Sequence, residues 1–179
     1  MAWTAPVTAI AGATVTSADF NTYIRDNLNQ TMAAKALNVG SLFAVTSANV
    51  IAECIPASDL VSASETTAST SYTDLATVGP TVTVTSGTFM IIVIGGRLGP
   101  NTTAAQSVKM AWAISGATTR AASDTWAAGP LGLGTSGAIY TSRWYYAGVT
   151  AGSNTVQAKY SVSGGTGTFG NRSLGVIPL

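Results

Sequence analysis

Residues 81–94 have the sequence TVTVTSGTFMIIVI. The first five alternate Thr with Val, which is the two-residue period of a strand with one buried and one exposed face. Ser86-Gly87 then interrupts the pattern, and residues 89–94 form an apolar run. A run without polar positions predicts a strand that is covered on both faces, either at the centre of a sheet or at a contact between subunits. This stretch therefore predicts a mainly β fold.

Further strands are predicted at regular intervals after residue 65. Turn-forming residues such as Gly79-Pro80, Gly152 and Gly164-Gly165 separate them. Seven or eight short antiparallel strands with regular turns are typical of a β-sandwich, and we expect one of jelly-roll type. The expected strands are residues 72–76, 81–85, 88–98, 108–114, 139–147, 155–162 and 172–177.

The chain divides into two predicted regions. Residues 65–179 are expected to form the β-sandwich, and residues 1–64 an N-terminal region for attachment and oligomerisation. Residues 56–68, which are rich in Ser, Ala and Thr, are expected to link the two. Residues 121–137 are irregular and contain Pro and Gly, which predicts a loop or a ragged strand and makes them the expected variable or contact surface.

One convincing helix is predicted, at about residues 17–30. Thr16 suits the N-cap position, and Asp19 three residues later can complete a capping box. Phe20, Ile24 and Leu28 follow at intervals of four, with Tyr23 beside them, so one face of the helix is apolar. Because isolated helices shorter than roughly 12–15 residues are marginal in water, this face needs a partner surface. The rest of the chain, symmetry-related copies or another protein could supply it, and we favour the last two.

Other features of this region point to the same role. Trp3 lies in an extended arm and packs either on its own domain or in a neighbour's pocket. A hairpin is expected at about residues 40–55, and a single hairpin is marginal alone. Arg25 and Asp26 lack an opposite charge three or four residues away, so they are either solvated or paired between copies around a threefold axis. The predicted attachment and oligomer interface consists of Trp3, Phe20, Tyr23, Ile24, Arg25, Asp26 and Leu28.

The composition favours a protein that works in an assembly. Charged residues make up 8% of the 179 residues, and the net charge is +1. Ordinary soluble proteins carry about 25% charged residues, and a surface with little charge repulsion favours association. The apolar run at residues 89–94 is far shorter than the roughly 20 residues of a membrane-spanning helix, and the basic residues are too few for a nucleic-acid footprint. A signal peptide is not expected, since no basic segment followed by an apolar one opens the sequence.

The sequence offers no recognisable catalytic, cofactor or metal site. It contains no His, which removes the usual general base near neutral pH and every Ser-His-Asp or Cys-His arrangement. Cys54 is the one cysteine, so a disulfide within the chain and a multi-cysteine metal site are excluded. In a predicted strand, this thiol is expected to be a small buried side chain. We therefore expect a non-enzymatic protein without cofactor or metal.

Aromatic residues leave a binding function open. Trp126 and Trp144 are candidates for an outward contact surface, whereas packing is favoured for Trp112 and Tyr145. A carbohydrate-binding module that recognises a host cell-wall glycan would expose Trp126 and Trp144 together on a concave face. This is the alternative from another class of function.

Three segments carry a resemblance. The first joins Trp3-Thr4-Ala5-Pro6, AGATVT at residues 11–16 and IRDNL at residues 24–28; the third covers residues 71–84, 152–160 and 164–178. The second, residues 35–55, matches the Lys-Gly-Asp-Leu repeat of phage fibre proteins only in part, because the Gly-Asp pair is missing. Together the segments resemble small virion structural proteins of tailed bacteriophages, which are common among phages of actinobacteria.

The resemblance implies a structural protein at the tail or capsid surface of a virion, as a homotrimer. The N-terminal region would dock on other virion proteins, and the β-sandwich would face outward. We expect a minor tail or tail-fibre protein. A capsid decoration or head-fibre protein uses the same parts and is the close alternative. The expected partners are the chain itself and other virion proteins, with a host glycan left open and nucleic acid and membranes excluded.

Overall fold

The alternation seen in the sequence builds the strands of the sandwich. The computed structural model describes residues 4–5, 8, 11–29, 31, 35–47, 49–101, 106–129 and 138–179. In β5 (Thr81–Ser86) every second side chain is buried, and β6 (Phe89–Pro100) follows after a short turn. Both strands lie where the sequence predicts them.

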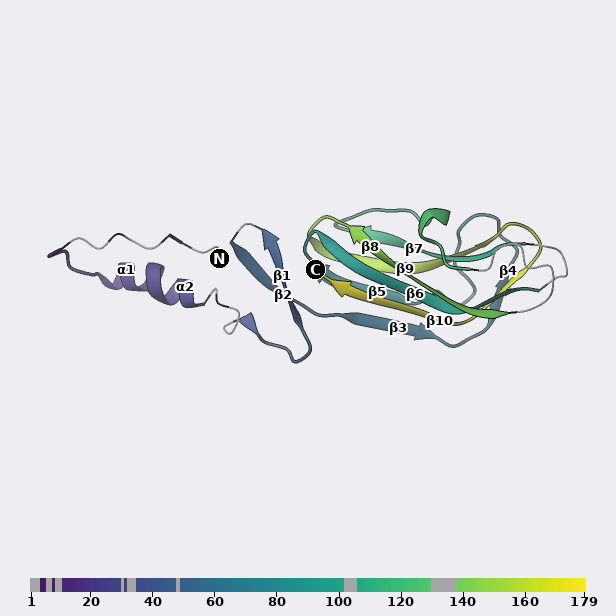
Figure 1. Ribbon diagram of the computed structural model, residues 1–179, viewed down its shortest axis with the longest axis horizontal. Helices are drawn as coiled ribbons and strands as arrows, with labels where there is room; N and C mark the ends of the chain where they lie inside the picture. Colours follow the sequence, from purple (N-terminus) through teal and green to yellow (C-terminus); the bar gives the residue numbers. More distant parts are fainter. Residues whose placement is uncertain are drawn as a thin grey trace.

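Two antiparallel sheets face each other (Figure 1). The five-stranded sheet has the order β3–β10–β6–β8, and β4 also pairs with β10. The three-stranded sheet has the order β5–β9–β7. The predicted β-sandwich is therefore confirmed. The remaining bounds are β3 (Ala57–Val61), β4 (Glu65–Thr67), β7 (Val108–Gly116), β8 (Ile139–Gly148), β9 (Gly152–Val162) and β10 (Gly167–Pro178), with a short 3₁₀ turn η2 (Asp124–Trp126) after β7.

The core lies between the two sheets. Each strand contributes the side chains of its inner face, and the largest are fully buried. Burial of this apolar surface is the main favourable term in folding. The core includes Val82, Val84, Met90, Ile92, Ile94, Leu98, Met110, Trp112, Ile114, Val156, Tyr160, Phe169, Leu174 and Val176.

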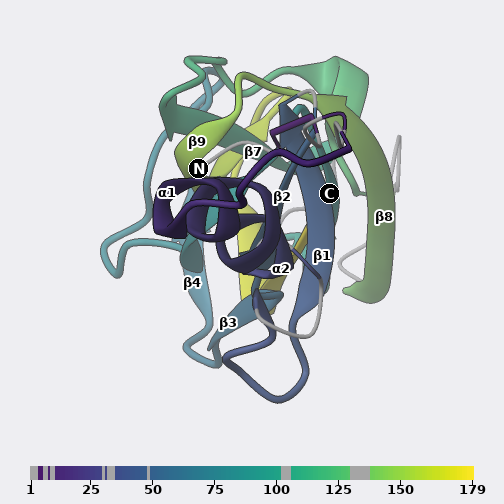
Figure 2. The same cartoon turned by 90° about the vertical axis from the view of Figure 1, so that its left-hand side faces the viewer.

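The N-terminal region extends from one end of the sandwich (Figure 1). Its helix consists of α1 (Ser17–Phe20), a π-helical turn η1 (Asn21–Arg25) and α2 (Asp26–Leu28). The hairpin of β1 (Leu42–Ser47) and β2 (Val50–Cys54) lies between the helix and the sandwich. Figure 2, viewed from the helix end, places the helix in front of the hairpin. A helix of the length and hydropathy needed to cross a membrane is absent from the described part of the chain.

Two sequence expectations are wrong. The linker predicted at residues 56–68 contains β3 and β4, which pair with β10, so the sandwich begins at Ala57 and the boundary predicted between residues 64 and 65 falls inside it. The pairing supplies the hydrogen bonds that this weakly β-forming segment lacks by itself. Residues 72–76, predicted as a strand, make only an isolated bridge between Thr73 and Tyr160.

Candidate interaction surfaces

The helix begins where the sequence predicts. The Thr16 hydroxyl oxygen accepts a hydrogen bond from the Asp19 amide at 3.1 Å, and the Asp19 carboxylate accepts one from the Thr16 amide at 3.0 Å. The capping box is thus confirmed. The hydrogen bonds from Thr16 lower the pKa of the Asp19 carboxyl, so this group is charged at the positive end of the helix dipole.

The predicted apolar face of the helix is exposed. Phe20, Ile24 and Leu28 are 52%, 46% and 59% exposed, respectively, and Tyr23 is half-buried. Neither the hairpin nor the sandwich, as far as the structure describes them, covers the three exposed side chains. An amphipathic helix with its apolar face in solvent is typical of a surface that another chain covers.

The Tyr23 side of the helix, next to the exposed apolar side chains, is held by Asn27, a residue that the sequence does not single out. Asn27 is only 4% exposed. Its side-chain oxygen accepts from the Thr4 amide at 3.0 Å, and its side-chain nitrogen donates to the Thr4 carbonyl at 2.9 Å. The amide therefore pairs with the N-terminal arm as a neighbouring strand would. Asn27 lies four residues after Tyr23, on the same side of the helix, but its partner is 23 positions away and no sequence pattern marks it.

Arg25 and Asp26 pair with each other within one chain. The Arg25 Nη2 lies 2.8 Å from Asp26 Oδ1, and the Arg25 Nε donates to the same oxygen at 2.9 Å. Each charge therefore has a partner without a neighbouring copy. Trp3, the remaining residue of the predicted interface, lies outside the described residues.

The connection between helix and hairpin is organised by Glu53 on β2. Its carboxylate accepts hydrogen bonds from the Leu37 amide, the Asn38 amide and side chain, and the Ser41 hydroxyl. The Ser41 bond is the main cause of a lowered pKa of Glu53. Cys54, next along β2, is buried as predicted, and burial raises the pKa of its thiol.

The structure does not bring Trp126 and Trp144 together. Trp126 is half-buried: its ring stacks on Trp112 with centroids 4.9 Å apart, and its Nε1 donates to the Trp112 carbonyl at 2.9 Å. Its ring also lies 6.1 Å from that of Tyr145. Trp144 is 68% exposed. It points to the other side of β8 from its neighbour Tyr145, because successive strand residues point to opposite sides. A sugar platform made of Trp126 and Trp144 is therefore not formed.

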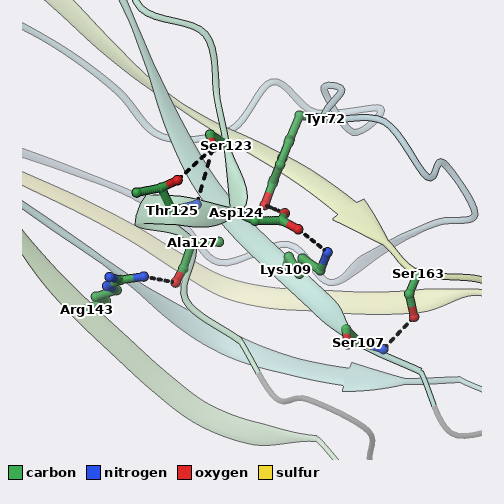
Figure 3. A network of polar contacts seen from close by, with 9 residues as sticks. All are labelled: Tyr72, Ser107, Lys109, Ser123, Asp124, Thr125, Ala127, Arg143 and Ser163. Carbon is green, nitrogen blue, oxygen red and sulfur yellow. Dashed lines mark hydrogen bonds and ion pairs between the residues drawn. The ribbon is translucent and has the colours of Figure 1, made fainter.

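A polar network fixes the first part of the predicted contact loop (Figure 3). Asp124 accepts hydrogen bonds from the Tyr72 hydroxyl and from the Lys109 ammonium, both at 2.7 Å. The hydrogen bond from Lys109 is the largest cause, and that from Tyr72 the next, of a lowered pKa of Asp124. The pKa of Tyr72 is raised, mainly by burial and also by its hydrogen bond to Asp124. Arg143 of β8 donates to the Ala127 carbonyl at 2.9 Å. These bonds tie residues 123–127 to the sheets, while residues 130–137 lie outside the described part of the chain.

Metal-ligating groups are not clustered. Within the described residues, no three Cys, Asp or Glu side chains lie close enough together to hold a metal ion. The surfaces described above carry exposed apolar side chains, and Arg25 and Asp26 beside the helix face are paired.

Comparisons with known proteins complete the description of the surfaces. No protein-family model and no curated protein matches this sequence. Among solved structures, a chain in the structure of infectious bursal disease virus, Gx strain, is similar with 12% sequence identity and a TM-score of 0.42. The similar region covers 79% of this chain and 38% of that chain, so this chain spans well under half the length of its neighbour.

Proposed function

We propose that this chain is a non-enzymatic structural protein of a tailed-phage virion. The N-terminal helix docks on another virion protein, and the sandwich faces outward. One observation carries the proposal: Phe20, Ile24 and Leu28 form an exposed apolar face at the end of the molecule away from the sandwich (Figure 1). The same segment has the sequence that resembles the N-terminus of such virion proteins.

The energetics of this face favour docking in several copies. Fully burying a Leu, Ile or Phe side chain contributes about 1.5–3 kcal/mol, and these three are already about half-buried. Each therefore adds on the order of 1 kcal/mol when covered, which is too little for a stable single attachment. Linked copies multiply the effect, since the second contact is intramolecular once the first is made.

The proposed docking face is tested with a pair of charge substitutions in the same helix. Ile24→Asp places a charge in the apolar face, and Thr22→Asp places the same charge at an exposed polar position. Particles assembled with each variant are purified and probed for the protein. The Ile24 variant is expected to be missing from particles and the Thr22 variant to be present at the wild-type level. Normal incorporation of the Ile24 variant would refute the docking role.

Within the virion we propose a minor tail or tail-fibre location. Immunogold electron microscopy of intact virions, with an antibody to residues 57–179, tests it. Label at the tail supports the fibre type, and label spread over the head would replace it with the capsid-decoration alternative.

A further inference from the structure

The two outer faces of the sandwich differ in chemistry. The three-stranded sheet shows solvent a polar face, with Thr81, Thr83 and Thr85 exposed on β5. Thr83 shares a hydrogen bond of 2.8 Å with Thr155 on β9. Such a face is well solvated and needs no partner.

The outer face of the five-stranded sheet is apolar. On its edge strand β8, Tyr140, Trp144 and Tyr146 are 72%, 68% and 50% exposed. They share one face because they lie an even number of residues apart. The apolar side chains continue across the sheet through cross-strand pairs: Trp144 opposite Val93, Tyr146 opposite Ile91, and Ile91 opposite Ile177. We call this surface the outer apolar face; it consists of Leu60, Phe89, Ile91, Val93, Tyr140, Trp144, Tyr146 and Ile177.

The outer apolar face has hollows beside its protruding rings. Gly95 lies between Ser142 of β8 and Ser173 of β10 in the sheet, and these small residues line a hollow of about 370 Å³ next to Tyr140. A second hollow, of about 280 Å³, lies at Gly175. A Cβ atom added at Gly175 would meet no atom within 4 Å, so this hollow is open to a partner.

We propose that the outer apolar face is the contact between copies of this chain, with the rings of β8 in one copy packing into the hollows of the next. The proposal adds a site of self-association on the sandwich to the one that the sequence predicts on the N-terminal helix. It rests on the proposed function only in expecting that the chain works in an assembly. Its test uses purified protein, so the result does not depend on whether the helix docks on a virion.

Area and charge favour a second copy as the occupant. An aromatic side chain offers 150–250 Å², so the exposed parts of these rings and aliphatic side chains present on the order of 800 Å², which is what one partner contributes to a standard interface. Arg97 is the one charged side chain among the described outward-facing residues of β6, β8 and β10, and it lies opposite Tyr140. Two such faces can therefore meet without burying an unpaired charge in their centre.

A glycan fits the same observations less well. Sugar binding would use the rings of β8 and polar groups around them. It would leave Leu60 and Ile177, on strands away from the rings, without a role. Aliphatic side chains spread over four strands are typical of a protein interface.

The experiment measures the mass of the purified full-length protein in solution by light scattering and sedimentation over a range of concentrations. The wild type is expected to be an oligomer. Trp144→Glu, which buries a charge in the contact, is expected to weaken association roughly 30-fold or more. Thr83→Glu, which adds the same charge to the polar face, is expected to leave the oligomer intact.

A second variant separates loss of contact from loss of folding. Gly175→Val places a side chain in the hollow, at a position where an added Cβ meets no atom within 4 Å, and Val has high strand propensity. This variant is expected to fold, with the circular dichroism spectrum of the wild type and a cooperative melting transition, but to lose self-association. A monomeric wild type, or an oligomer in both the Trp144 and Gly175 variants, would overturn the proposal. A monomeric wild type that binds host cell-wall polysaccharide, and loses that binding in Trp144→Ala, would assign the face to a glycan instead.

Discussion

Arg172 on β10 is a fully buried charged residue in the sandwich. Its Nη2 lies 3.4 Å from the Glu65 carboxylate, and its guanidinium lies 5.3 Å from the centre of the Tyr160 ring. Burial in the same place raises the pKa of Tyr160 to about 12. The pair joins β10 to β4, which is a three-residue strand with few other contacts. The sequence contains no sign of it, because the two residues are more than 100 positions apart.

Glu65→Gln is expected to destabilise the sandwich. The variant leaves Arg172 buried without an anion, and breaking a buried pair from one side costs about 3–5 kcal/mol. For a chain of this length, 1 kcal/mol corresponds to about 2–4 °C, so the melting temperature followed by circular dichroism is expected to fall by about 6–12 °C or more. Asp74→Asn, which breaks the more exposed pair with Lys159, is the control and is expected to cost less than about 1 kcal/mol. Equal effects of the two variants would contradict this role of Arg172.

The same pair predicts how stability depends on pH. Hydrogen bonds from Thr77, followed by the charge of Arg172, lower the pKa of Glu65 in the folded state. Because the folded pKa lies below the unfolded one, the stabilisation is complete above the ordinary Glu value near 4.5 and is lost as the pH falls through the folded pKa. The melting temperature of the wild type is therefore expected to drop below pH 4.5, and the difference between wild type and Glu65→Gln to shrink there. A difference that stays constant from pH 7 to pH 3 would refute the linkage.

Among the elements, the connection before β1 depends on a single carboxylate. Glu53 accepts four hydrogen bonds from residues 37–41, whereas an Ala side chain has no atom that can accept one. In Glu53→Ala, amide hydrogen exchange at Leu37 and Asn38 is expected to speed up, while exchange in β6 and β9 stays unchanged. Protection of Leu37 and Asn38 at the wild-type level would show that the connection is held by other contacts.

Elements with a local signal could be predicted from the sequence. The alternation of β5 and the capping box at Thr16 depend on residues within a few positions of each other, and both are confirmed. β3 could not be predicted, because its Ser, Ala and Asp residues are typical of linkers and β10, more than 100 residues away, supplies its partner. The pairing of Asn27 with Thr4 is missed for the same reason.

The surfaces show the same division. The exposed face of the helix follows from the spacing of Phe20, Ile24 and Leu28, and their positions were predicted. The outer apolar face was not, although Tyr140, Trp144 and Tyr146 have the even spacing of one strand face. Spacing alone does not tell which face of β8 the second sheet covers; the fold settles that by turning Tyr145 inward.

At the scale of the whole molecule, the core belongs to the sandwich. Its buried members extend from Leu75 to Val176, and Ala57 of β3 packs against them. In the described part of the chain, the hairpin meets the sandwich at one end, where Gly87 lies close to the Val45 and Leu179 carbonyls and β2 contacts β5. The N-terminal region therefore contributes little to the stability of the rest, and its short helix and single hairpin have no core of their own.

This division predicts how fragments behave. Residues 57–179 are expected to fold alone, with a melting temperature within about 4 °C of the full chain, the equivalent of about 1 kcal/mol.

Residues 65–179 correspond to the boundary predicted from the sequence. They lack β3, which pairs with β10 over Ala57–Val61. The Asp59 carboxylate of β3 also accepts a hydrogen bond from the Thr81 amide. Removing β3 leaves the edge of β10 unpaired, and an open edge strand promotes aggregation. The shorter fragment is therefore expected to melt at a clearly lower temperature and to aggregate at concentrations where residues 57–179 stay soluble. If the two fragments melt together, β3 is not part of the folding unit, and the boundary at residue 65 would be restored.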